Sequence, residues 1–161
     1  MKKMAVVCLG VLIFWSMAIG APSSAKPDAF VLADRIGEPN AQSFFVFSTS
    51  VGNYIIRQDG MGEFTSPSGL RRVFYMKLGA KGRIESIYFL EHQGDLFLLY
   101  EVRDAASQWA YLMRMEQQKR KPKWVTPLPG GEVEAPSVEG DRVIIKSVEI
   151  SKADGRILKQ D

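Results

Sequence analysis

Short apolar runs rich in β-branched and aromatic residues follow one another along most of this 161-residue chain, and Gly, Pro, Asn and Asp separate them. Apolar residues that recur with a helical period are scarce. Runs of this length between turn-forming residues are typical of antiparallel strands. The sequence therefore predicts an all-β, antiparallel meander of short strands. The expected strands are residues 43–50, 53–58, 70–78, 84–91, 95–103, 109–116, 123–128, 142–146 and 148–151.

The patterns inside these runs differ. Residues 71–76 alternate, with Arg71, Val73 and Tyr75 on one face. Residues 96–100 are apolar throughout, which predicts a strand covered on both faces. Residues 105–115 also have helical propensity, but Trp109, Tyr111, Met113 and Met115 fall on one face of a strand, which favours the β interpretation.

A second level of order is a repeated turn. Gly52-Asn53, Gly94-Asp95 and Gly140-Asp141 each introduce an apolar run, at intervals of roughly 40 residues, the period of a four-stranded propeller blade. About three blades would fit, fewer than closed propellers use, so open sheet edges would remain. Residues 29–36 are expected to form a strand that closes the structure from the N-terminal side. Such turns also occur in ordinary hairpins, so a closed β-barrel or a β-sandwich stays open as an alternative.

The N-terminus has the form of an export signal. Lys2 and Lys3 precede a long apolar stretch, and small residues lead up to Ala25. This pattern predicts a signal peptide over residues 1–25 and a single all-β domain over residues 26–161, periplasmic or secreted. The alternative is an uncleaved anchor that leaves the domain facing outward. Cys8 is the only cysteine, so a cleaved chain would contain no disulfide and no thiolate site.

Charge and chemistry give no catalytic motif. The net charge of +3 falls to about +1 without the first 25 residues, which gives no argument for nucleic acid as a partner. His92 lies in a predicted turn, where it is either a general base or an exposed polar residue. No metal-binding spacing occurs, so no metal is expected. Gly60-Met61-Gly62 and Gly130-Gly131 lack phosphate-loop features and are interpreted as turns.

One basic segment is the clearest candidate binding site. Lys119, Arg120, Lys121 and Lys123 lie next to Trp124, and together they could contact an anionic surface. The alternative is a solvated hairpin tip whose charges discourage edge pairing.

The aromatic residues of the predicted strands could form a platform for stacking sugars or bases, but their positions favour core packing and cross-strand pairs. They are Phe44, Phe45, Phe47, Tyr54, Phe74, Tyr75, Tyr88, Phe89, Phe97, Tyr100, Trp109 and Tyr111.

The last third of the chain, residues 109–161, contains an ordered set of motifs: residues 111–115, Trp124 to Leu128, Ala135-Pro136-Ser137-Val138, residues 140–145 and Ala153-Asp154-Gly155-Arg156-Ile157. This order resembles the blade of quinoprotein-type (PQQ-like) β-propellers, in which a strand ends in Trp and an Asp/Thr-Gly-Lys turn leads to the next strand. The resemblance implies propeller-like repeats. The cofactor-binding residues of that family have no matching positions, so no cofactor is implied.

These features together predict an exported, non-enzymatic domain that binds a protein or cell-envelope partner, or a second copy of itself, by strand addition or docking at open edges. Membrane contact is expected only through an uncleaved N-terminus or the basic turn at residues 119–123. Two alternatives are a carboxylate-based hydrolase with His92 as a possible base, and a small-molecule carrier with a cavity inside a barrel.

Overall fold

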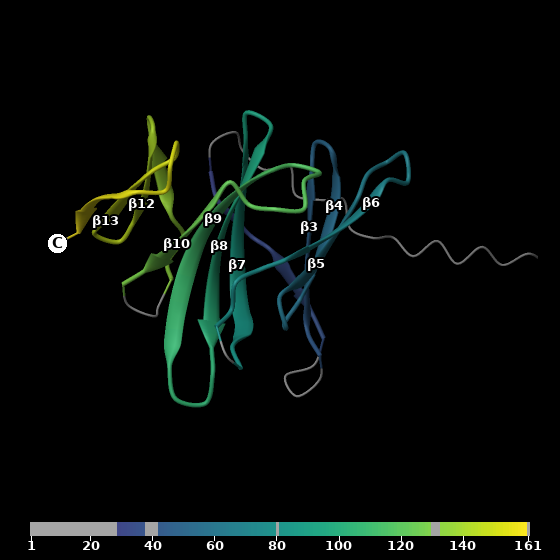
Figure 1. The fold of residues 1–161 in the computed structure, drawn as a ribbon, viewed down its shortest axis with the longest axis horizontal. Coiled ribbons are helices and arrows are strands. Elements are labelled where there is room, and N and C mark those ends of the chain that lie inside the picture. Colours follow the sequence, from purple (N-terminus) through teal and green to yellow (C-terminus); the bar gives the residue numbers. More distant parts are fainter. Residues whose placement is uncertain (1–28, 38–41, 80, 130–132, 161) are drawn as a thin grey trace, which may run out of the picture.

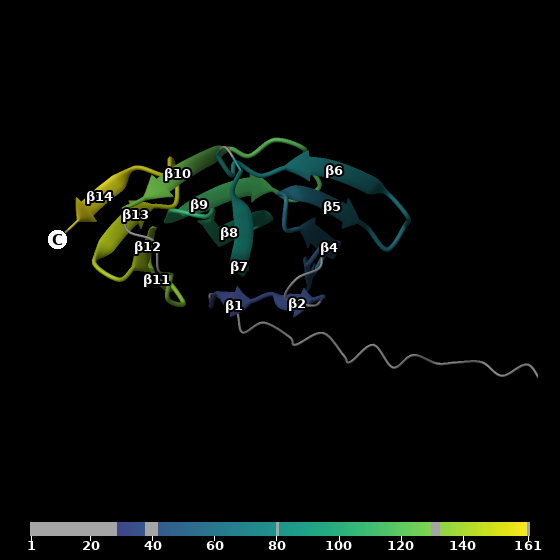
Figure 2. The same ribbon diagram turned by 90° about the horizontal axis from the view of Figure 1, so that it is seen from below.

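Fourteen antiparallel strands in three sheets make up the computed structural model, which describes residues 29–37, 42–79, 81–129 and 133–160. No helix occurs in these ranges. The sheets lie side by side along the molecule (Figures 1 and 2) and are called here the first, middle and third sheets. The prediction of an all-β antiparallel chain is confirmed. None of the three sheets closes on itself, so the alternative of a closed barrel is wrong.

The first sheet is a five-stranded meander in which each strand pairs with its neighbours in the sequence. Its strands alternate between residues that face the middle sheet and residues that face solvent, as a half-buried sheet requires. In spatial order they are β2 (Asp34–Ile36), β3 (Phe44–Thr49), β4 (Gly52–Arg57), β5 (Met61–Thr65) and β6 (Arg71–Tyr75).

The middle sheet contains the longest strands, and the third sheet the short strands of the C-terminal part. The middle sheet has the order β1 (Val31–Leu32), β7 (Arg83–His92), β8 (Asp95–Arg103), β9 (Gln108–Glu116) and β10 (Trp124–Leu128). The third sheet is a meander of β11 (Ser137–Glu139), β12 (Arg142–Ile145), β13 (Val148–Ser151) and β14 (Ile157–Gln160).

The two cores explain why β8 is apolar throughout. Leu96, Leu98 and Tyr100 point into a core shared with the first sheet, whereas Phe97 and Leu99 point into a second core shared with the third sheet. All five residues are buried. The prediction that this run is covered on both faces is therefore confirmed, and the middle sheet is the layer that joins the other two.

The prediction for β9 is confirmed as well. Tyr111, Met113 and Met115 are buried in the core between the first and middle sheets, and Trp109 packs against the same core. Leu112 points to the opposite side, into the second core. Side chains of a strand alternate between its faces, so this division requires β geometry rather than a helix.

The N-terminal segment joins two sheets instead of forming one closing strand. Val31 pairs with Phe89 of β7 in the middle sheet, and Arg35 pairs with Phe45 of β3 in the first sheet. Buried Ala33 lies between the two short strands, and its N–H donates to the carbonyl of Ile87 at 2.8 Å. Residues 29–36 thus fix the edge of one sheet relative to the edge of the next (Figure 2).

The structure places the three Gly-Asx dipeptides at corresponding positions. Gly52 begins β4 after the β3–β4 turn, Gly94 lies in the β7–β8 turn, and Gly140 lies in the β11–β12 turn. All three glycines have positive φ, which the turns require and which glycine adopts at little cost. Each sheet therefore contains a four-stranded meander, β3–β6, β7–β10 or β11–β14, with the dipeptide at its first hairpin.

Strand β5 corrects the interpretation of Gly60-Met61-Gly62 as a turn. Only Gly60 is in the turn, and Met61 begins the strand. Gly62 lies within the strand. This position requires glycine because a Cβ there would overlap the ring of Phe74 on the paired strand β6. The two glycines made a strand look like a loop, since glycine normally weakens strands.

Two sequence predictions fall outside the described residues, namely the signal peptide over residues 1–25 and the Gly130-Gly131 turn. Within the described ranges, no helix is long and apolar enough to span a bilayer.

Candidate functional site: an open groove along strand β6

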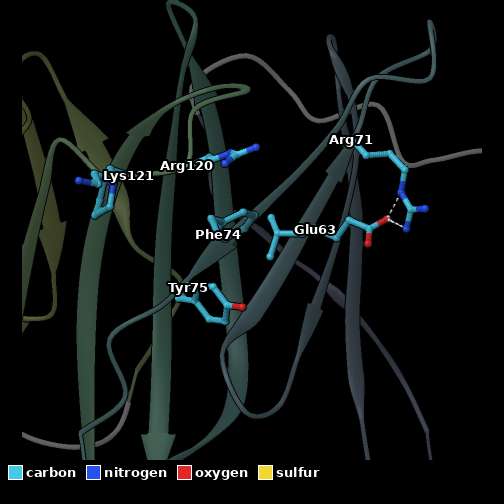
Figure 3. Close-up of a pocket in the computed structure, with 8 residues that line it drawn as sticks. Glu63, Arg71, Phe74, Tyr75, Arg120 and Lys121 are labelled. Carbon is cyan, nitrogen blue, oxygen red and sulfur yellow. Dashed lines mark hydrogen bonds and ion pairs between the residues drawn. The ribbon is translucent and has the colours of Figure 1, made fainter.

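An open groove of about 770 Å³ runs along β6, the last strand of the first sheet. One side is formed by β5 and β6, and the other by the connection between β9 and β10 (Figure 3). We call it the β6 groove. Its lining residues are Glu63, Arg71, Val73, Phe74 and Tyr75 on the strands and Arg120, Lys121 and Pro122 on the connection.

The alternation of β6 determines which side chains the groove receives. Phe74 points inward and is buried in the core between the first and middle sheets. Val73 and Tyr75 point to the outer face of the first sheet, where Val73 is 39% exposed and Tyr75 is 70% exposed. Tyr75 was expected to pack in the core or against a cross-strand neighbour. It does pair with Met61 across β5, but most of its surface is open to solvent.

Two backbone hydrogen bonds define the pairing between β5 and β6. Ser66 N donates to Leu70 O, and Met76 N donates to Gly60 O, each at 2.9 Å. In an antiparallel pair, residues that exchange hydrogen bonds alternate with residues that do not. The register is continuous between these two bonds, so the even-numbered residues of β6 bond to β5.

The odd-numbered residues of β6 consequently face the open side of the strand. The N–H and C=O groups of Arg71, Val73 and Tyr75 point away from β5, and β6 pairs with no further strand among those described. Their side chains also lie on the outer face. The β6 groove therefore presents a row of backbone donors and acceptors beside exposed apolar surface.

The charge of the groove is positive. Arg71 donates to Glu63 through Nε at 2.9 Å and Nη2 at 2.6 Å, so these two charges compensate each other. Arg120 and Lys121 are exposed and form no ion pair with a described residue. In Figure 3, Arg120 extends toward Phe74 and the groove, whereas Lys121 extends away from it.

The connection that carries these cations is anchored at its start. The buried side chain of Gln117 accepts a hydrogen bond from Thr49 Oγ1 at 2.7 Å and donates to Glu91 Oε1 at 2.8 Å. Glu91 also accepts from Ser50 N at 2.8 Å and from the hydroxyl of Ser50. Burial opposes ionisation of Glu91, but these hydrogen bonds from Ser50 and Gln117 outweigh it and hold the pKa below its usual range.

Gln118 and Glu91, at the same point, lie next to Tyr54, a core residue of β4. Burial raises the pKa of Tyr54 to about 12, an effect that the backbone of Gln118 reduces and the charge of Glu91 reinforces. Tyr54 is 1% exposed and stacks on Phe47, so the beginning of the connection closes over the core between the first and middle sheets. This packing holds Arg120 next to β6.

The five predicted binding residues do not act as one surface. Lys119 is 3.8 Å from Glu116 and lines a second, smaller hollow with Arg72. Arg120 and Lys121 lie at the β6 groove. Lys123 and Trp124 turn the other way, toward the third sheet.

Lys123 belongs to a charged cluster around Asp95, whose side chain is 5% exposed. Lys123 Nζ donates to both carboxylate oxygens of Asp95, at 2.8 and 3.0 Å, and Arg114 donates through Nε at 2.6 Å and through Nη2. Arg114 also donates to the carbonyl of Lys152 in the third sheet's last turn at 2.5 Å. This cluster links the middle and third sheets, and its carboxylate is occupied by two cations.

Trp124 and His92 lie at the same junction. Trp124 packs edge-on against Phe97, with ring centroids 6.0 Å apart, and against Gly155, where a Cβ would come within 2.6 Å of the indole. His92 Nε2 is 3.3 Å from Lys152 Nζ, and its ring packs edge-on against Phe97. Both side chains therefore contribute to the packing between two sheets.

Sequence reasoning predicted the strand over residues 70–78, which contains β6, and singled out Arg120 and Lys121, but it did not place the strand and the cations together. The sequence signal for β6 was its alternation, which separates Val73 and Tyr75 from Phe74. That pattern does not tell which face is covered, because the middle sheet comes from residues much later in the chain. No family model, curated protein or solved structure matches this chain, so the function proposed below rests on the geometry.

Proposed function

We propose that this protein is a non-enzymatic binding domain that docks a protein partner on the outer face of its first sheet, beside the β6 groove. The observation that carries the proposal is the concentration of exposed apolar side chains on this face. Ile36, Ile55, Val73 and Tyr75 are all at least 39% exposed, and the register places them on the same outer face, on the alternate strands β2, β4 and β6. Exposed apolar surface gathered on one face is characteristic of interaction sites.

The third sheet differs in its central strands, although its edge strand β14 also exposes Ile157 and Leu158. On the outer face of the third sheet, Arg142 forms ion pairs with Glu149 at 2.6 Å and with Glu139 at 3.8 Å. Since both sheets are at the ends of the same row, the contrast supports a specific role for the apolar face.

The charges around the groove favour an acidic partner over a second copy. Arg71, Arg72 and Arg120 gather at or near the free edge of β6, and among the residues that the structure describes only Arg71 of these three is paired with a carboxylate. Two copies docked edge to edge would bring these cations together, and like charges across an interface cost several kcal/mol. A partner that offers carboxylates next to apolar side chains complements both properties of the face.

We further propose that the three four-stranded meanders are propeller-like blades in a row that does not close. Two observations support this: the Gly-Asx dipeptide at the first hairpin of each meander, and the packing of Trp124 of one meander against Gly155 of the next. Thr126 Oγ1 adds a hydrogen bond to Gly155 O at 2.5 Å. The expected location of the domain is periplasmic or secreted, as the N-terminal 25 residues suggest.

Photo-crosslinking tests the proposed docking face. A photoreactive amino acid is placed at Ile55, which is 45% exposed on the first sheet, or at Leu158, which is 49% exposed on the third sheet and serves as the matched control. Irradiation of the cells that produce the protein should give a discrete protein adduct from Ile55 and none from Leu158. Identical adducts from both positions, no adduct from Ile55, or an adduct that contains only a second copy of the chain would contradict the proposal.

A further inference from the structure

We infer that the partner supplies an extended acidic segment that adds to β6 as a new edge strand. This inference rests on the proposed function, because the segment would occupy the β6 groove beside the docking face. It specifies the conformation of the bound segment, the chemistry of its side chains, and the cation that selects it.

The backbone of β6 is prepared for such an addition. Arg71, Val73 and Tyr75 direct their N–H and C=O groups toward the groove, which is the arrangement that an incoming strand needs in order to extend the sheet. The groove of about 770 Å³ is open. Residues of β5 and β6 form one of its walls, and residues 120–122 form the other. The main chain of the segment would therefore find a row of partners along the whole length of β6.

The two faces of the added strand would meet different surroundings. Successive side chains of a strand point to opposite faces. On the outer face they would lie beside Val73 and Tyr75, which are exposed and apolar or aromatic. On the inner face they would point toward the connection from β9, where Arg120 extends into the groove (Figure 3). A segment in which apolar residues alternate with Asp or Glu fits this arrangement.

The same charges account for the selectivity of the edge. Natural sheets protect open edges with cations that prevent pairing with identical edges. Here Arg72 and Arg120 would repel a second β6 edge, which carries the same charges, and would attract an acidic strand. One set of side chains thus blocks self-pairing and recruits the intended segment.

The test uses a synthetic peptide of eight residues in which Val and Glu alternate, labelled for fluorescence polarisation. The full chain should bind it. Arg120→Ala should weaken binding about threefold, the size expected for one exposed charge pair, and should reduce its salt dependence. Lys146→Gln removes the same charge from an exposed turn between β12 and β13 in the third sheet, and should leave the affinity unchanged.

Two modified peptides separate strand addition from docking through side chains alone. One carries N-methyl groups on every Val, and the other on every Glu, so that each loses the N–H donors along one edge only. Strand addition requires that one of them binds and the other does not. Equal binding of both, no binding of the unmodified peptide, or equal effects of Arg120→Ala and Lys146→Gln would overturn the inference.

The outcome is distinguishable from failure of the proposed function. If Ile55 gives a specific adduct while the peptides fail the N-methyl test, the docking face stands and strand addition is wrong. If the peptides pass while Ile55 gives no adduct, β6 accepts a strand but the wider apolar face has no docked partner.

Discussion

Asp95 shows how a single residue at a hairpin turn can join two sheets. It follows Gly94 in the β7–β8 turn, and its buried carboxylate binds Lys123 and Arg114 of the same sheet. Arg114 in turn donates to the carbonyl of Lys152 in the third sheet. Burial alone would raise the pKa of Asp95, but the hydrogen bonds and charges of Lys123 and Arg114 outweigh it and hold the pKa below its usual range.

Because the pKa of Asp95 is lowered in the folded state, the free energy of unfolding depends on pH. A carboxylate with a lower pKa in the folded state stabilises the protein above its unfolded pKa of about 3.9, and the contribution is lost as the pH falls below that value. Asp95→Asn should therefore lower the free energy of unfolding by about 2 kcal/mol at pH 7, because two cations lose their partner. The difference from the unmodified protein should shrink at pH 3.

Urea unfolding at the two pH values measures this effect. Asp59→Asn is the control, because Asp59 forms an exposed pair with Arg57 and should contribute less than about 0.5 kcal/mol. An Asp95→Asn deficit of the same size at pH 7 and pH 3 would show that ionisation of Asp95 is not the cause.

Gly62 is the second residue with a specific structural requirement. Its neighbour on β6, Phe74, occupies the space where a Cβ would lie. Gly62→Ala should lower the free energy of unfolding by about 1–3 kcal/mol, the usual cost of overpacking a core. In a Phe74→Leu background the cost of Gly62→Ala should fall, as a double-mutant cycle by chemical denaturation would detect. An unchanged cost would mean that the ring of Phe74 is not the obstacle.

At the scale of elements, local patterns predicted the long strands well. The run 95–103 matches β8 at both ends, because its continuous apolar residues are bounded by Gly94 and by the turn around Asp104. Strand β5 was missed because Gly62, which the packing of Phe74 requires, has the local signature of a turn. Such a requirement depends on a neighbouring strand and leaves no trace in the β5 sequence itself.

The segment that contains β1 and β2 gives an element-scale prediction. Ala33→Pro removes the N–H that bonds to Ile87 O between the two sheets. The loss of this buried hydrogen bond, together with the proline ring, should cost about 2–3 kcal/mol of unfolding free energy. Leu32→Ala is the control, because Leu32 is 53% exposed and should have little effect. Thermal or urea unfolding compares the two variants. Equal losses of unfolding free energy would show that the hydrogen bond of Ala33 does not stabilise the fold more than an exposed side chain does.

For the whole molecule, the middle sheet is the shared layer of both cores. Trp109 packs against the core on the side of the first sheet, and Trp124 against the core on the side of the third sheet. Since every described strand belongs to a sheet that contacts one of these cores, unfolding should be a single cooperative transition. Neither the order of the sheets nor the face left uncovered could be predicted from sequence, because both depend on contacts between residues far apart in the chain.

The two tryptophans provide the measurement. In the chain from Lys26 onward, Trp124→Phe leaves Trp109 as the only fluorophore of its type, and Trp109→Phe leaves Trp124. Each reporter should follow the circular dichroism transition of its own variant in urea. A Trp124 signal that changes at lower urea concentration than the circular dichroism signal of the same variant would show that the third sheet unfolds independently.

The pairing of β1 with β7 also imposes an order in time. Val31 lies near the start of the chain and its partner Phe89 lies past the middle. A ribosome that adds about 5–20 residues per second makes Phe89 only several seconds after Val31. During this interval β2 can pair with β3, but β1 has no strand to pair with until β7 has been made. The link between the first and middle sheets at Ala33 therefore forms only after all strands of the first sheet have been synthesised.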